Sequence, residues 1–187
     1  MSHYRLTAHL SLAILILWVA MKTGWQILYN SKGVRVKTYN SRSLLMILLI
    51  TATALIGGLV AGLKAGLIYN TFPMMDEGWL PDAMWHMTPA WLNLFENAGT
   101  VQFIHRLLAL ITFVAIIFFS HKLMMRTPHR AIKNNLVWVM GLAVAQVTLG
   151  IFTLIYMVPV SLGALHQLVA ILLFIAAVSL RENLRST

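Results

Sequence analysis

Three of the seven histidines in this 187-residue chain lie inside long apolar segments, namely His9, His105 and His166. Ionisable side chains are costly within a membrane-spanning helix, so these three are candidate functional residues. At 1.5 Å per helical residue, each lies roughly 7–9 Å from the same end of its expected helix. Their shared depth favours a common ligand over three unrelated roles.

Three kinds of chemistry suit histidines placed at one level. Interhelical hydrogen bonding is the simplest. A zinc site usually takes three or four nitrogen, oxygen or sulfur ligands, but the chain has no cysteine and no acidic residue near these histidines. Heme fits better, because its iron takes two axial ligands and its flat macrocycle fills an apolar slot between helices.

The sequences that follow the histidines resemble one another. HRLLA begins at His105, HQLVA begins at His166, and HLSLA begins at His9. A phenylalanine also follows eight residues after each of the first two, as Phe113 and Phe174. This pattern indicates a repeated helical hairpin. It predicts His105 and His166 as the axial pair and leaves His9 without a partner of its own kind.

The residues next to this pair have expected roles as well. Arg106 follows His105, and a buried arginine can bind a propionate carboxylate with two hydrogen bonds. Snorkelling to the membrane surface and pairing with Glu96 are the alternatives for Arg106. Gln167 follows His166 and is predicted to donate a hydrogen bond near the heme.

Composition places all of these residues in a membrane protein. Hydrophobic residues make up 59% of the chain and charged residues 10%, and the mean hydropathy is +0.79. Soluble domains carry about 25% charged residues, so a soluble or disordered protein is excluded. Five apolar stretches are long enough to span a bilayer as helices. They cover residues 4–28, 43–68, 100–123, 135–157 and 160–180.

Charges predict how these helices cross the membrane. Two loops are basic and contain no acid, and they hold Lys32, Arg35, Lys37 and Arg42, and Lys122, Arg126, Arg130 and Lys133. The loop before the third helix is acidic and contains Asp76, Glu77, Asp82 and Glu96. Basic loops stay on the cytoplasmic or matrix side. The N-terminus and the acidic loop are therefore expected outside, and the C-terminus inside.

Two longer motifs resemble a known family. Residues 58–75 read GLVAGLKAGLIYNTFPMM, and residues 94–109 read LFENAGTVQFIHRLLA. Both are similar to the heme A synthase family in its mitochondrial and proteobacterial branch. YRL before His9, QVTLGI at residues 146–151 and ALHQ at residues 164–167 extend the resemblance over nearly the whole chain.

The resemblance implies a fold and a reaction. Members have eight membrane helices in two four-helix halves, and they oxidise a methyl group of heme O to the formyl group of heme A for terminal oxidases. By resemblance, His105 and His166 match the axial ligands of a resident heme b. His9 matches a ligand of the substrate heme O, whose second ligand lies in the other half.

The expected organisation follows from the same match. Residues 1–30 are predicted to be a transmembrane helix left over from the N-terminal half-bundle. Residues 43–187 are predicted to form the C-terminal four-helix heme-binding bundle, with an outer loop at about 69–99. The chain resembles the last five of eight helices, so a truncated gene, a split gene or a misassigned start is expected.

Two other functions remain open at this stage. One is a b-type heme module that transfers electrons or docks a partner without its own catalysis, and the other is a heme-free assembly fragment. The expected partners are the lipid bilayer, the missing N-terminal half, heme O synthase, an electron donor and assembly factors of a terminal oxidase. No nucleic acid is expected. The expected location is the bacterial inner membrane or the mitochondrial inner membrane.

Overall fold

The computed structural model describes residues 2–29 and 37–186, and its long elements are all helices. They are α1 (His3–Tyr29), α2 (Lys37–Gly62), α3 (Ala98–Met124), α4 (Arg130–Ile155) and α5 (Val160–Ser186). Short 3-10 helices, η1 (Ala65–Leu67) and η2 (Ala90–Leu94), lie between α2 and α3. All five long helices are long and apolar enough to cross a membrane, which confirms the predicted all-helical, multi-pass membrane protein.

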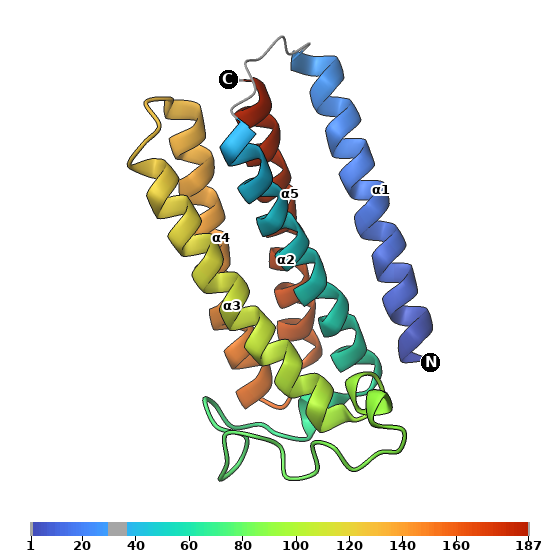
Figure 1. The fold of residues 1–187 in the computed structure, drawn as a ribbon. Coiled ribbons are helices and arrows are strands. Elements are labelled where there is room, and N and C mark those ends of the chain that lie inside the picture. The colour runs from blue at the N-terminus through green and yellow to red at the C-terminus, as the bar shows by residue number, and fades with distance from the viewer. Residues whose placement is uncertain (1, 30–36, 187) are drawn as a thin grey trace.

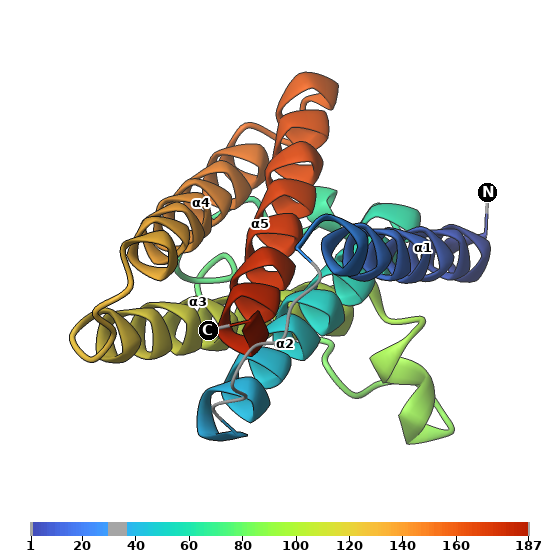
Figure 2. The same ribbon diagram turned by 90° about the horizontal axis from the view of Figure 1, so that it is seen from above.

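Four of the helices form a ring, and α1 lies outside it. The neighbouring pairs are α2 with α3, α3 with α4, α4 with α5, and α5 with α2. Seen from above, α1 lies against α2 and α5 and apart from α3 and α4 (Figures 1 and 2). Because α3 and α5 are not neighbours in the ring, they are diagonal partners across it.

The two ends of the bundle differ in chemistry. We call one the loop end, formed by residues 63–97, the turn at residues 156–159 and the start of α1 (Figure 1). We call the other the basic end, which holds Lys122, Arg126, Arg130 and Lys133. The acidic loop and these basic residues, which the sequence predicted to lie on opposite sides of the membrane, therefore lie at opposite ends of the bundle. Lys32 and Arg35, which belong to the predicted basic loop, lie outside the described residues.

The tightly packed core occupies the half of the bundle near the basic end. Its buried residues come from the start of α2, the end of α3, the start of α4 and the end of α5, and include Ile47, Ile116, Leu136, Val139 and Val178. By contrast, residues 144–168, all of which the structure describes, contain no buried residue. Near the loop end, buried residues lie instead on α2 and α3, among them Leu59, Val101 and Gln102.

The second helix ends earlier than the sequence predicted. Hydropathy extends it to Ile68, but α2 ends at Gly62 and Lys64 adopts a left-handed conformation with φ 53°. The chain then turns back, and the carbonyl of Tyr69 accepts hydrogen bonds from Gln102 at 2.9 Å and Arg106 at 2.8 Å. Side chains from α3 thus satisfy this carbonyl in place of helical hydrogen bonds, so the outer loop begins at residue 63 instead of 69.

Three other boundaries also differ from the prediction. The second helix begins at Lys37 instead of Ser43, the fourth begins at Arg130 instead of Asn135, and the fifth continues to Ser186 instead of Leu180. Most of the extra residues are polar, so a hydropathy criterion omits them. A helix needs only about 20 residues to cross the hydrocarbon, and its polar ends can continue into the headgroup region.

Candidate functional site

The two predicted axial histidines lie on the diagonal helices of the ring. His105 is in the first third of α3 and His166 is in the first third of α5, and both helices have 27 residues. Both side chains are half-buried. The structure places both histidines in the half of the ring near the loop end, and their pairing as ligands stays a prediction.

Each histidine ring lies against a glycine of the preceding helix. A Cβ atom added at Gly57 of α2 would lie 3.1 Å from Cε1 of His105. One added at Gly150 of α4 would lie 3.0 Å from Cε1 of His166. Such separations leave almost no room for a side chain, so both positions favour glycine for steric reasons. The two helical hairpins that resemble each other in sequence therefore also share the same contact between a histidine ring and a glycine.

Both rings also keep a nitrogen free. Nδ1 of His105 and Nδ1 of His166 are buried and have no hydrogen-bond partner among the described residues. A buried polar atom without a partner opposes folding unless a ligand or water satisfies it. Two imidazoles that each lie against a glycine and have an unsatisfied ring nitrogen fit the two axial ligands of a heme.

One residue at this site was missed by the sequence analysis. Nε2 of Gln146, on α4, lies 3.1 Å from Nε2 of His166. Gln167, the predicted neighbour, has an exposed side chain on the outer surface of α5. A glutamine inside an apolar helix was the available signal, because polar residues within membrane helices need partners. The predicted role of Gln167 stays a prediction.

His9 is placed differently from the other two histidines. It lies near the start of α1, and its side chain is exposed on that helix. In the described part of the chain, no group of three or more His, Cys, Asp or Glu residues could hold a metal ion. The site is therefore built around a pair, and His9 is separate from that pair.

Arg106 binds the backbone of the outer loop. Its Nη1 donates to the carbonyls of Thr71 at 3.0 Å and Met74 at 3.2 Å, and its Nη2 donates to that of Tyr69. Its Nε is buried and has no partner among the described residues. The alternative of pairing with Glu96 is wrong, since these carbonyls hold the guanidinium. The predicted contact with a propionate stays a prediction.

Glu96 instead ties the outer loop to α1. The hydroxyl of Tyr4 donates to its Oε1 at 2.5 Å, and Nε2 of His3 lies 3.5 Å from its Oε2. His3 also packs against Gly62 of α2, and Thr7 packs against Gly58. The glycines of α2 therefore contact two neighbours, α1 and the His105 ring.

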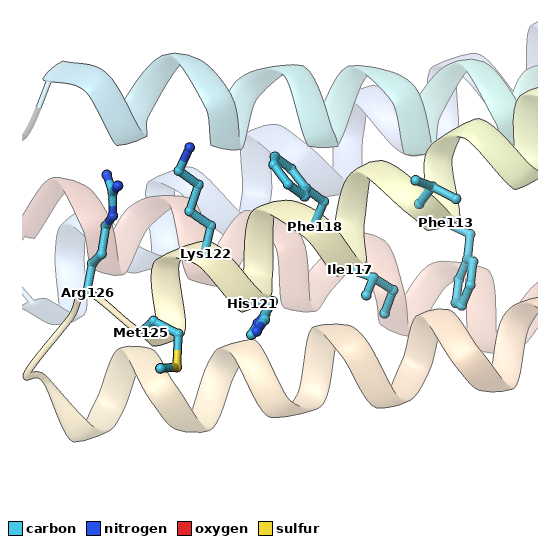
Figure 3. A pocket seen from close by; sticks show the side chains of 8 residues that line it. Phe113, Ile117, Phe118, His121, Lys122, Met125 and Arg126 are labelled. Atoms are coloured by element: carbon cyan, nitrogen blue, oxygen red, sulfur yellow. The ribbon is translucent and has the colours of Figure 1, made fainter.

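A separate groove lies on the surface of α3 near the basic end. It has a volume of about 650 Å³, and its lining residues come from α3 and from the two residues that follow it, among them Phe113, Phe118, His121 and Lys122 (Figure 3). His121 is sixteen residues beyond His105, which is about 24 Å along a helix. This open, apolar groove is therefore a separate feature from the histidine site.

Comparison with known proteins agrees with this geometry. The model of the COX15-CtaA family, described as cytochrome oxidase assembly protein, matches residues 1–178. The chain belongs to this family. The match includes α1 through most of α5, and with them both histidines and both glycines of the site.

Several curated members of the family are similar to the chain. Heme A synthase of Parvibaculum lavamentivorans is 39% identical over 178 residues, covering 95% of this chain and 50% of that protein. Heme A synthase of Bartonella tribocorum is 38% identical over 179 residues, with the same two coverages. That of Wolbachia pipientis subsp. Culex pipiens is 38% identical over 177 residues, covering 92% and 51%.

Two facts limit what these relatives say of the chain. The chain spans about half the length of the curated relatives it matches. No solved structure matches it.

Proposed function

We propose that this chain is the heme-binding part of a heme A synthase, which oxidises a methyl group of heme O to the formyl group of heme A. The observation that supports it most is the pairing of His105 with His166 across a bundle that is similar to named heme A synthases over more than 90% of its length. The named relatives favour this function over a heme module without catalysis.

The chain's own residues would hold a resident heme b. His105 and His166 would supply the axial ligands, and Gly57 and Gly150 leave their rings room beside α2 and α4. Arg106 would steady a propionate near the loop end while it fixes the outer loop. When bound, the heme would supply electron transfer. The apolar walls would keep water away from it.

His9 would belong to a second site, where the substrate heme O binds. Its side chain is exposed on α1, so a further helical segment would be needed to enclose a heme there. We propose the N-terminal half of a heme A synthase as this partner, in one polypeptide or from a split gene. Heme O synthase, an electron donor and oxidase assembly factors are further proposed partners.

The proposed location is the bacterial inner membrane or the mitochondrial inner membrane. The basic end would face the cytoplasm or matrix, because positively charged loops are retained there. The N-terminus and the loop end would then face outward, and the C-terminus inward. This orientation would place the histidine site in the outer half of the bilayer.

The proposal is tested by pigment analysis in a bacterial host that makes heme O and lacks its own heme A synthase. We expect no heme A from this chain alone. We expect heme A when the N-terminal half of the Parvibaculum lavamentivorans heme A synthase is co-expressed, and no heme A when the co-expressed chain has His9→Ala. Heme A from this chain alone would show that no partner segment is needed. Purified chain without heme would overturn the resident heme site.

A further inference from the structure

The two histidines share a glycine contact and differ in a side-chain contact. Each ring lies on a glycine, Gly57 or Gly150, and each glycine is preceded four residues earlier by a polar residue. These polar residues are Thr53 on α2 and Gln146 on α4. Four residues make one turn of a helix, so Thr53 and Gln146 occupy matching positions in the two hairpins.

Thr53 directs its hydroxyl away from His105. Its Oγ1 donates to the carbonyl of Leu49 at 2.8 Å and lies 2.9 Å from Oγ1 of Thr112. These contacts occupy the hydroxyl within α2 and against α3. The His105 ring therefore receives no side-chain hydrogen bond from the matching position.

Gln146 directs its side chain to His166. Its Nε2 lies 3.1 Å from Nε2 of that ring. Its Oε1 is buried and has no partner among the described residues. An amide carries both donors and an acceptor, so Gln146 can bind a ring nitrogen in either tautomer. An apolar side chain would fill the same space without leaving an unsatisfied oxygen, so packing alone does not explain the amide.

We propose that Gln146 is a positioning residue of the histidine site, which holds the His166 ring and makes the two axial imidazoles chemically unequal. This inference rests on the proposed heme site. A hydrogen bond from a neighbouring side chain orients a ligating imidazole and changes its basicity. Among the described residues, a side chain hydrogen-bonded to the ring is recorded for His166 and not for His105, so the bond of His166 to iron would differ from that of His105.

The test compares purified full-length chain with Gln146→Met and with Thr53→Val as the matched control. Methionine keeps the length and flexibility of glutamine and loses the hydrogen bond. Three quantities are measured for each chain: the heme affinity by transfer to apomyoglobin, the midpoint potential by redox titration, and the g values of the low-spin ferric signal by electron paramagnetic resonance.

We expect Gln146→Met to bind heme about 10-fold more weakly, with shifted g values and a shifted midpoint potential. Thr53→Val should match the wild type in all three. Gln146→Asn keeps a buried amide but is one methylene too short to reach the ring. It should reproduce the shift, and it serves as the second variant if Gln146→Met does not fold.

The outcomes separate this inference from the proposed function. Wild-type chain that binds no heme overturns both. Variants of Gln146 that bind heme with wild-type affinity, potential and g values overturn the positioning role and leave the heme site in place. An equal shift in Thr53→Val would mean that general repacking causes the effect, and it would also overturn the positioning role.

Discussion

At the scale of single residues, the three membrane histidines differ in what surrounds them. His105 and His166 each present a buried, unpartnered Nδ1 beside a glycine. His9 has an exposed side chain on a helix outside the ring. The same residue type at the same depth therefore has two different environments, and substitution tests whether the three histidines have different roles.

Replacing either His105 or His166 with alanine should abolish the low-spin bis-imidazole spectrum of the purified chain. Iron has two axial positions, so loss of one imidazole leaves a high-spin or heme-free protein. Absorption spectroscopy of the oxidised and reduced protein checks this result. His121→Ala, at the basic end of the same helix as His105, is the matched control and should keep the wild-type spectrum. Retention of the low-spin spectrum by His105→Ala would contradict the assignment.

Replacing His9 with alanine should leave the heme b spectrum of this chain nearly unchanged. The physical reason is that His105 and His166 would already fill both axial positions in the proposed site, while the His9 side chain is exposed on α1. The same absorption spectra, normalised to protein, provide the measurement. Bleaching of the heme in His9→Ala would make His9 an axial ligand and would refute the pairing.

At the scale of elements, two hairpins repeat the same helix contact. The pairs are α2 with α3 and α4 with α5, and in each pair a glycine near the end of the first helix receives the histidine of the second. Close approach at a small residue is a common way for membrane helices to pack. Here the close contact between the two helices also determines where the histidine ring lies. The packing of the helices and the position of the imidazole therefore depend on each other.

Filling either contact should displace a ring and lower heme binding. A Cβ at Gly150 would already be 3.0 Å from His166, so Gly150→Leu must shift the ring or the helix. Overpacking of this kind typically costs about 1–3 kcal/mol. We expect a heme-to-protein ratio well below wild type in a pyridine hemochrome assay, and a similar loss for Gly57→Leu.

Gly141 provides the control for that experiment. It lies in α4 as Gly150 does, but a Cβ there meets no atom within 4 Å. Gly141→Leu adds the same side chain in open space and improves helix propensity by up to about 1 kcal/mol. It should therefore keep full heme occupancy. Full occupancy in Gly150→Leu as well would show that the glycine contact does not control the site.

At the scale of the whole molecule, packing density and charge both change from one end to the other. The basic end has a closed core, and the loop end holds the acidic loop and the histidine site. Glu96 and Arg106 join this loop to α1 and α3 through side-chain hydrogen bonds.

The proposed orientation predicts which end is reached by a membrane-impermeant reagent. The chain contains no cysteine, so single cysteines can be introduced without a background. Asp82→Cys in the acidic loop should react with an impermeant maleimide in intact cells, because acidic loops are translocated readily. Arg126→Cys at the basic end should react only after the membrane is permeabilised. The reverse labelling pattern would invert the topology.

The amino-acid sequence by itself determined the class of the protein and the number of its long helices. Hydrophobic composition and run length are sufficient for this, because a bilayer requires about 20 apolar residues per crossing regardless of which helices are neighbours. Depth along the helices and the repeat also singled out His105 and His166. Both depend only on position along the chain, and the rise of 1.5 Å per helical residue converts that position directly into depth in the membrane.

Only the tertiary structure decided which residues meet across helices. The His166 ring is 3.1 Å from Gln146, twenty residues away along the chain, and Arg106 bonds to Tyr69 instead of pairing with Glu96. The sequence also did not show where α2 ends, because the apolar run continues past Gly62. The carbonyl of Tyr69, farther along the chain, accepts a hydrogen bond from Gln102 of α3. Hydropathy records the preference of each residue for lipid over water. It does not record how a helix is rotated about its axis, and that rotation determines which side chain a histidine faces.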